Sequence, residues 1–119
     1  MTARGPRRRR KQLARGREFQ ELVAEVARAF DPNSRIEAGE WVRGPDGQLD
    51  MDVSIRGTVD GAPFLAVIEC KDFNAATTGP VGRQWVDALD SKRLDLGADA
   101  ALICSNAGFT RDALNKARY

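Results

Sequence analysis

The sequence predicts one α/β domain whose elements follow the order αβββαβα, a small mixed sheet flanked by helices. Three observations lead to this fold class. Apolar residues recur at helical spacing near the N-terminus, and two extended apolar runs flank an Asp-Gly turn. A helical stretch then separates the last two strands, which favours a parallel crossover. With 119 residues, the chain is long enough for a single core.

The first helix is predicted over residues 17–30 and ends at Asp31-Pro32. Its apolar side chains follow helical spacing and are expected to form a buried stripe: Phe19, Leu22, Val23, Val26, Ala27 and Phe30. A first strand is predicted over residues 35–42, and the turn at residues 44–47 leads into the second.

The second strand, residues 49–55, alternates strictly between apolar and polar side chains. One face carries Leu49, Met51, Val53 and Ile55, and the other carries Asp50, Asp52 and Ser54. The third strand, residues 64–71, is an apolar run that ends in Glu69-Cys70-Lys71. Because side chains alternate along a strand, Glu69 and Lys71 are expected to point the same way.

A hairpin turn at Asp60-Gly61 would make paired residue numbers sum to 121. This register sets Asp52 opposite Glu69 and Asp50 opposite Lys71, with Met51 against Cys70 on the other face. One face of the hairpin then gathers three carboxylates and a lysine.

The second helix is predicted from Pro80 to about Leu96, with Gly97 as its stop and Trp85 in the core. A buried strand over residues 100–104 follows, and Thr110 is expected to cap a last helix over residues 111–118.

The composition narrows the kinds of catalytic and metal site that the chain can have. The chain has no histidine, which excludes Ser-His triads and His-ligated zinc. Cys70 and Cys104 are interpreted as core residues in a reducing compartment. Without a long apolar run or a signal-peptide pattern, we expect a cytoplasmic protein with no membrane span, and we expect no organic cofactor.

Basic residues are concentrated at the N-terminus. Residues 1–17 hold eight of the 19 Lys and Arg residues and no acid. We therefore predict a basic, flexible arm over residues 1–16 and a folded domain over residues 17–119. The run Arg7, Arg8, Arg9, Arg10 and Lys11 is expected to contact nucleic-acid phosphates. The alternative is a tail that only improves solubility.

The acidic face of the hairpin predicts a metal site. Like charges directly opposed across strands destabilise a sheet, so a compensating cation is expected. Hard oxygen ligands suit Mg²⁺, with Mn²⁺ as a substitute. A lysine beside the metal can orient an attacking water or stabilise charge on phosphorus, which is the chemistry of phosphodiester hydrolysis.

Asp52 followed by Glu69-Cys70-Lys71 on the next strand resembles the PD-(D/E)XK nuclease signature of the restriction-endonuclease-like fold. The chain is similar to the Mrr-like branch in particular. Four stretches in order carry that resemblance, which covers residues 16–117: Gly16-Arg17-Glu18-Phe19, Met51-Asp52-Val53-Ser54-Ile55, Ile68-Glu69-Cys70-Lys71-Asp72 and Ser105-Asn106-Ala107-Gly108-Phe109-Thr110.

The resemblance implies a Mg²⁺-dependent DNA endonuclease with Asp52, Glu69 and Lys71 as catalytic residues. Asp52, Glu69 and the backbone carbonyl of Cys70 would hold the metal. In such families a glutamate often follows the phenylalanine of the first helix directly, whereas this chain has Gln20. Either Glu18 substitutes for it or the site works without a helical carboxylate. Gln84 and Asp50 are further accessory candidates.

Two alternatives stay open. The first is a catalytically inactive nuclease-fold module that binds nucleic acid or a protein partner, which the departure at Gln20 favours. The second is a structural subunit that binds DNA only through its basic arm. Loss of product formation in EDTA would distinguish an enzyme from a binder. A homodimer is one way for so small a nuclease to cut both strands of a duplex.

Overall fold

The computed structural model describes residues 6–73 and 78–118, and it confirms the α/β fold with the element order αβββαβα. In chain order its elements are α1 (Pro6–Phe30), β1 (Arg35–Gly44), β2 (Gly47–Val59), β3 (Ala62–Lys71), α2 (Arg83–Leu96), β4 (Ala100–Ser105) and α3 (Arg111–Ala117). Within this described part of the chain, no helix combines the length and hydropathy needed to cross a membrane.

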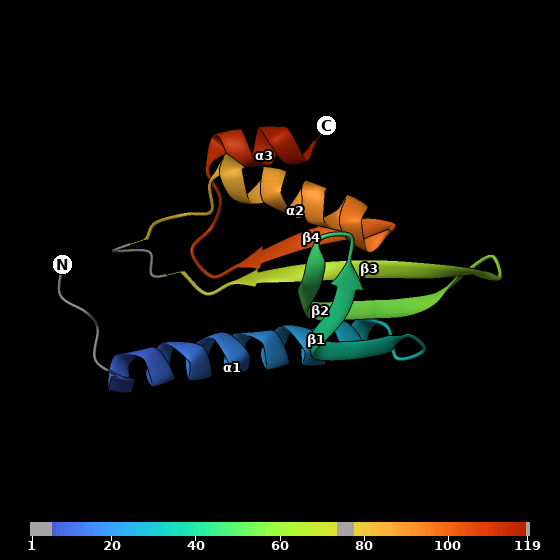
Figure 1. Cartoon of the computed structure of the whole chain (residues 1–119), viewed down its shortest axis with the longest axis horizontal. Coiled ribbons are helices and arrows are strands. Elements are labelled where there is room, and N and C mark those ends of the chain that lie inside the picture. The colour runs from blue at the N-terminus through green and yellow to red at the C-terminus, as the bar shows by residue number, and fades with distance from the viewer. Residues whose placement is uncertain (1–5, 74–77, 119) are drawn as a thin grey trace.

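The four strands form one mixed sheet in the order β1-β2-β3-β4. The first three strands are antiparallel neighbours, and β4 runs parallel to β3 after the crossover through α2, as predicted. Helix α1 covers one face of the sheet, and α2 lies with α3 over the other face (Figure 1).

The core has two parts, one on each face of the sheet. Between α1 and the sheet, the buried residues are Ala24, Ile36, Val53 and Ile68. Between the sheet and α2, they are Met51, Val67, Leu89 and Ala98. The strands are therefore apolar on both faces in the middle of the sheet, as expected where helices cover both sides.

Helix α1 differs from its prediction in length and in the face that it buries. It begins at Pro6, a residue type suited to a first helical position, and thus includes most of the predicted arm. Ala24 is fully buried, and its small side chain allows close contact with the sheet. Contact therefore runs along Val23, Ala24 and Ala27, while the expected core residue Phe30 is 87% exposed. Two other residues of the predicted stripe are exposed as well, Leu22 and Val26.

The hairpin between β2 and β3 has the predicted turn and register. Asp60 and Gly61 have φ values of 52° and 80°, which suit a two-residue turn with both central residues left-handed. Val53 pairs with Ile68, and Ile55 with Ala66, as predicted. The ladder ends at the Val53–Ile68 pair, so the expected pairing of Asp52 with Glu69 does not form.

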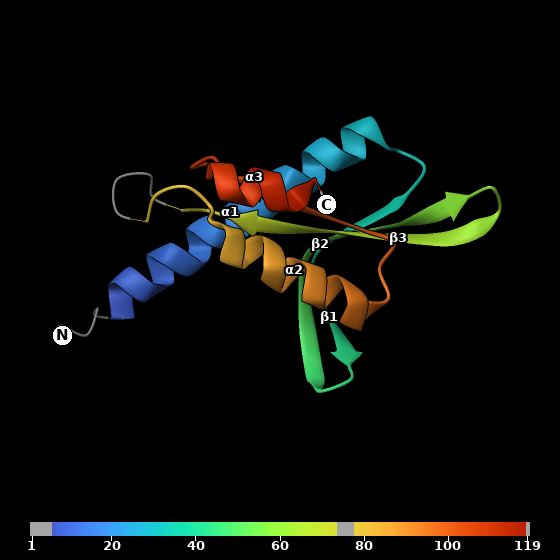
Figure 2. The ribbon, with the colours of Figure 1, turned by 90° about the horizontal axis from the view of Figure 1, so that it is seen from above.

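The strict alternation predicted for β2 is wrong at Met51. Val53 packs toward α1, but Met51 packs toward α2 and not against Cys70. The cause lies in a bend at Asp52 and Gly39. Gly39 has a φ of 72°, and it interrupts the β1–β2 pairing between Ala38–Val53 and Glu40–Met51. Beyond this bend the β1–β2 hairpin projects away from β3 (Figure 2).

The C-terminal half follows the prediction with one change at the start of α2. This helix begins at Arg83, because Val81 forms a bridge to Phe109 instead of a first helical turn. Gly97 ends α2 in the left-handed conformation, as predicted. The Thr110 side chain accepts a hydrogen bond from the backbone N–H of Ala113 and caps α3, also as predicted.

Candidate metal and catalytic site

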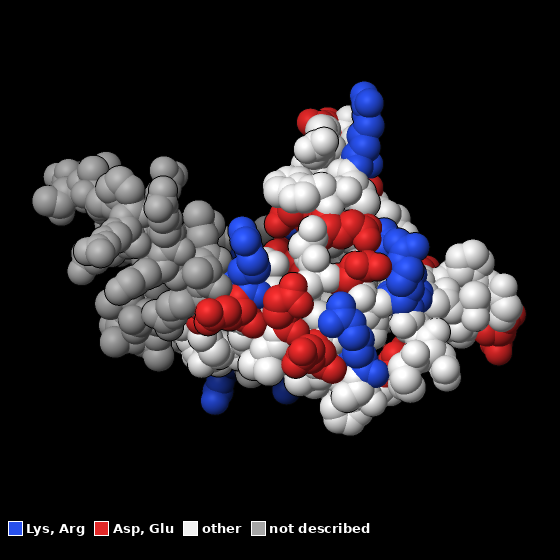
Figure 3. All heavy atoms as spheres, turned by 90° about the horizontal axis from the view of Figure 1, so that it is seen from below, with Lys and Arg blue, Asp and Glu red and all other residues white. Residues whose placement is uncertain are grey.

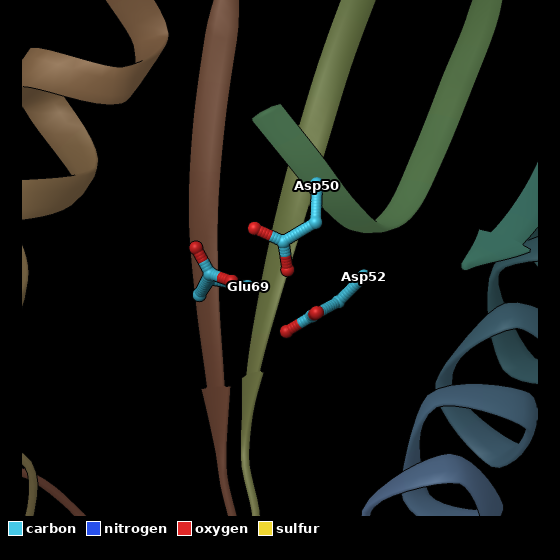
Figure 4. A group of neighbouring side chains, drawn as sticks. All are labelled: Asp50, Asp52 and Glu69. Atoms are coloured by element: carbon cyan, nitrogen blue, oxygen red, sulfur yellow. The ribbon is translucent and has the colours of Figure 1, made fainter. Parts of the chain in front are cut away.

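Three carboxylates meet where β2 separates from β3. Asp50 and Asp52 come from β2 and Glu69 from β3, and one oxygen of each lies within 4.8 Å of the others. Figure 4 shows the three side chains directed toward one another. We call Asp50, Asp52 and Glu69 the acidic cluster. The sequence predicted this gathering, although the chain achieves it by a bend and not by direct cross-strand pairing.

Asp52 is the most buried member of the cluster, with 9% of its surface exposed. Its Oδ2 accepts a hydrogen bond of 2.8 Å from the backbone N–H of Cys70. Burial and the nearby charge of Glu69 raise the pKa of Asp52 to about 6, although the Cys70 hydrogen bond acts in the opposite direction. A bound cation would favour the ionised form of this carboxyl.

The Asp52 hydrogen bond from Cys70 also explains the end of the ladder. The N–H of Cys70 donates to a side chain and not to the main chain of β2. The N–H of Cys70, which lies in β3 between Glu69 and Lys71, is therefore directed at the acidic cluster. Its thiol is free and buried enough that the pKa rises to about 12, and the thiol of Cys104 beside it in β4 is also free.

Gln20 reaches the cluster from α1. Its side-chain nitrogen donates a hydrogen bond of 3.0 Å to Oδ1 of Asp52, so both oxygens of that carboxylate are held by the protein. Glu18, the suggested substitute for a helical carboxylate, is exposed on the outer side of α1 and does not join the cluster. The Gln20 amide therefore occupies the position on α1 where related nucleases were expected to have a glutamate.

Lys71 shares a face with Glu69, as the alternation of β3 predicted. Its Nζ lies 4.0 Å from the centre of the Trp85 ring on α2. The edge of Phe73 packs against the same ring, with the ring centres 5.7 Å apart. Among the described acids, none forms an ion pair with Lys71. Trp85 is thus a partly exposed platform for an ammonium and not a core residue as expected.

Lys92 of α2 is a cluster residue that sequence reasoning missed. Its Nζ lies 3.1 Å from Oδ1 of Asp50 and 3.2 Å from Oε2 of Glu69. Burial alone would lower the pKa of Lys92, but the charges of Glu69 and Asp50 raise it. A signal existed in the sequence, since Lys92 falls between Leu89 and Leu96 on the apolar side of α2.

The remaining predicted residues lie apart from the cluster or outside the described side chains. Gln84 is exposed in the first turn of α2 and makes no hydrogen bond to the cluster among the described residues. Arg7, Arg8, Arg9, Arg10 and Lys11 belong to α1, but their side chains fall outside the described part of the structure.

A groove of about 540 Å³ opens beside the cluster, between α1 and the β1–β2 hairpin. Its lining includes Arg17, Gln20, Gly39, Trp41, Asp50 and Asp52. Trp41 is 65% exposed, which is unusual for so large an aromatic side chain. On the face that carries α1, acidic side chains gather near the centre, with basic ones among and beside them (Figure 3). A second groove of about 600 Å³, between α2, β4 and α3, does not contain the cluster.

Comparisons with known proteins agree with the fold. The family model described as "Restriction endonuclease", the Mrr-type catalytic domain, matches residues 12–119. A crystal structure titled as a protein of unknown function, AF1548, is 21% identical and superposes with a TM-score of 0.70. The match covers 87% of this chain and 53% of the other, so the chain spans about half the length of that structure.

No match is found among curated proteins. The family match covers nearly the whole chain, the structural likeness supports the same fold, and the acidic cluster lies where the nuclease signature predicted carboxylates. The chain belongs to the Mrr-type restriction-endonuclease family.

Proposed function

We propose that this protein is a Mg²⁺-dependent DNA endonuclease that hydrolyses phosphodiester bonds at the acidic cluster. One observation carries the proposal: three carboxylates meet within 4.8 Å at the fork, the point where β2 separates from β3 after the Val53–Ile68 pair. The chain that holds them belongs to a nuclease family. The single positive charge of Lys92 offsets only part of the charge repulsion among these carboxylates, and a divalent cation would offset the rest.

The donor set fits a hard divalent cation. It offers carboxylate oxygens, and the described residues bring no thiol or imidazole into the cluster, as zinc would prefer. We assign Asp52, Glu69 and the backbone carbonyl of Cys70 as ligands, with Asp50 as an accessory carboxylate. Bound Mg²⁺, or Mn²⁺ in its place, would polarise a phosphate oxygen and lower the pKa of a coordinated water.

The protein's own residues prepare the site. Hydrogen bonds from Gln20 and Cys70 fix the Asp52 carboxylate while leaving lone pairs on both oxygens for a ligand. Lys71 would donate hydrogen bonds from Nζ to the attacking water or to the scissile phosphate. The Trp85 ring holds that ammonium on the same face as Glu69. Removing Trp85 would therefore loosen Lys71 without removing its charge.

The groove beside Asp52 is the proposed path of the DNA strand. It joins the cluster to Arg17, and the basic run of residues 7–11 continues along the same helix. Arginine and lysine bind phosphates through counterion release, and an exposed tryptophan such as Trp41 can stack on a base. Bound DNA would thus find a stacking surface in the groove, phosphate contacts along the helix and a metal site at the cluster.

The decisive experiment is a cleavage assay of the purified full chain on plasmid, branched and single-stranded DNA, with Mg²⁺, Mn²⁺ or EDTA. We expect cleavage with either metal, none in EDTA, and a loss of about a hundredfold or more in Asp52→Asn, Glu69→Gln and Lys71→Met. Lys116→Met on α3 is the matched control, and circular dichroism verifies folding. Undiminished cutting by Lys71→Met would remove the proposed role of the lysine. Cutting in EDTA would remove the role of the metal.

A second candidate is a nuclease-fold module that binds DNA without turnover. Gln20 favours it, because an amide and not a carboxylate faces Asp52 from α1. Such a module would bind DNA equally with Mg²⁺ or EDTA and would yield no product with any substrate in the panel. Product formation by the unmodified chain would exclude it.

A further inference from the structure

The acidic cluster already contains a cationic group from the protein. Lys92 extends from α2 and places its ammonium between two of the three carboxylates, 3.1 Å from Asp50 and 3.2 Å from Glu69. Only 17% of the Lys92 side chain and 15% of the Glu69 side chain are exposed. An ion pair this shielded from water is screened weakly by salt and holds its partners firmly.

The two carboxylates differ in how they would hold Lys92. Glu69 is shielded, and it belongs to the residues assigned above to the metal. Asp50 is about half exposed and is assigned only an accessory role. Lys92 can therefore lose Glu69 and stay attached to Asp50, which would keep its ammonium at the exposed edge of the cluster.

An ammonium and a divalent cation cannot share the Glu69 oxygen without strong repulsion. Mg²⁺ binds carboxylate oxygens at about 2.1 Å, which would bring it close to any ammonium on the same oxygen. Like charges at such distances repel by several kcal/mol even at an effective dielectric constant of about 20. A metal that takes Oε2 of Glu69 therefore has to displace Lys92 from that oxygen.

We propose that Lys92 is the resident counter-ion of the metal-free cluster and that a divalent cation displaces its ammonium from Glu69 toward Asp50. This inference rests on the metal site of the proposed function. It makes Lys92 a positioning residue that stabilises the three carboxylates before the metal arrives. Lys92 thereby lowers the affinity of the cluster for the metal, since binding must break the ion pair with Glu69.

The test measures binding of Mn²⁺ to the full chain by titration calorimetry without DNA, so that no cleavage step enters. Lys92→Met keeps the length of the side chain and removes its charge, and Lys116→Met is again the matched control. We expect Lys92→Met to bind Mn²⁺ about tenfold more tightly or better, with a lower melting temperature in EDTA. We expect Lys116→Met to behave like the unmodified chain.

A second measurement does not depend on whether Lys92→Met folds. The chain has four lysines, so selective labelling at the side-chain ε-carbon gives few NMR signals, and Lys92→Arg assigns one of them. Titration with diamagnetic Mg²⁺ should move the Lys92 signal and leave that of Lys116 in place.

The outcomes separate this inference from the proposed function. Equal Mn²⁺ affinity in Lys92→Met and the unmodified chain, or a Lys92 signal that Mg²⁺ does not move although it binds, would overturn the displacement and leave the metal site intact. Weaker binding by folded Lys92→Met would also overturn the displacement, because the lysine would then assist the metal. Absence of metal binding in both folded proteins would overturn the proposed function itself.

Discussion

At the scale of single residues, Asp52 is the member of the acidic cluster that is most shielded from water. Its burial is offset by hydrogen bonds to both oxygens, and these come from a side chain on α1 and from the main chain of β3. One carboxylate thus links a helix to a strand on the far side of the fork. The energetic cost of burying the Asp52 carboxylate appears in the raised pKa of this residue.

The raised pKa predicts how stability changes with pH in EDTA. The pKa of Asp52 is about 6 in the folded chain against an ordinary value of 3.8, so the unfolded chain releases this proton first as pH rises. The free energy of unfolding should therefore fall between about pH 4 and pH 6, by up to about 3 kcal/mol.

Asp52→Asn should remove this part of the pH dependence. We expect urea unfolding of the variant to show a smaller loss of stability from pH 4 to pH 7 than the unmodified chain. Asp46→Asn, in the exposed β1–β2 turn, should leave the dependence unchanged. The same pH slope in Asp52→Asn and the unmodified chain would contradict this explanation.

At the scale of elements, α1 combines two charge patterns. Its first half carries the basic run, and its second half carries Glu18, Glu21 and Glu25. The transition between them falls at Arg17, beside the groove that reaches Asp52. The division of the chain into an arm over residues 1–16 and a domain over residues 17–119 stays a prediction, although α1 is one helix from Pro6 to Phe30 and runs across that boundary.

Replacing Arg7, Arg8, Arg9, Arg10 and Lys11 by glutamine should weaken DNA binding and its salt dependence together. Each lost phosphate contact lowers the slope of log affinity against log salt by about 0.9, so five contacts give up to about 4.5. Fluorescence anisotropy at several KCl concentrations in EDTA measures that slope. Lys116→Gln is the control, and an unchanged slope in the fivefold variant would assign DNA binding to other residues.

The elements also show which parts of the structure the sequence could predict. The Asp60-Gly61 turn, the Gly97 stop and the Thr110 cap depend on a few neighbouring residues, and all three are confirmed. The face that α1 buries and the side of the sheet that Met51 occupies depend on how the elements pack. Predictions from helical spacing and strand alternation alone were therefore wrong at these places.

The candidate site divides along the same line. Alternation along β3 placed Glu69 and Lys71 on one face, and the hairpin turn paired β2 with β3 as far as Val53 and Ile68, next to Glu69. Lys92 comes from a helix 23 residues further along the chain than Glu69, and only the crossover brings the two together. The Gly39 bend had a local signal, since glycine inside a strand often marks a bulge or bend.

At the scale of the whole molecule, the described part of the chain contains a single acidic cluster. Under the proposed function, one such site would cut one DNA strand at a time, so a double-strand break would require two copies or two encounters. The homodimer remains a prediction that the composition of the products can test.

Supercoiled plasmid should first be converted to nicked circles at low protein concentration, and the fraction of linear product should rise as the concentration rises. Agarose gels of the time course in Mg²⁺ measure both products. Asp52→Asn mixed in excess with the unmodified chain should suppress linear product more than nicked product if two copies act together. A ratio of linear to nicked product that is independent of concentration would contradict assembly from separate copies.

Where β2 separates from β3, stability and the proposed activity make opposite demands on the same residues. Two further rungs of main-chain pairing would close the sheet over Asp52 and strengthen the domain, yet they would take the Cys70 amide away from the carboxylate. Mutations that extend the β2–β3 pairing past Asp52 should therefore yield proteins that are more stable but lack the proposed activity. A search for thermostable variants is expected to select changes at this point of the chain.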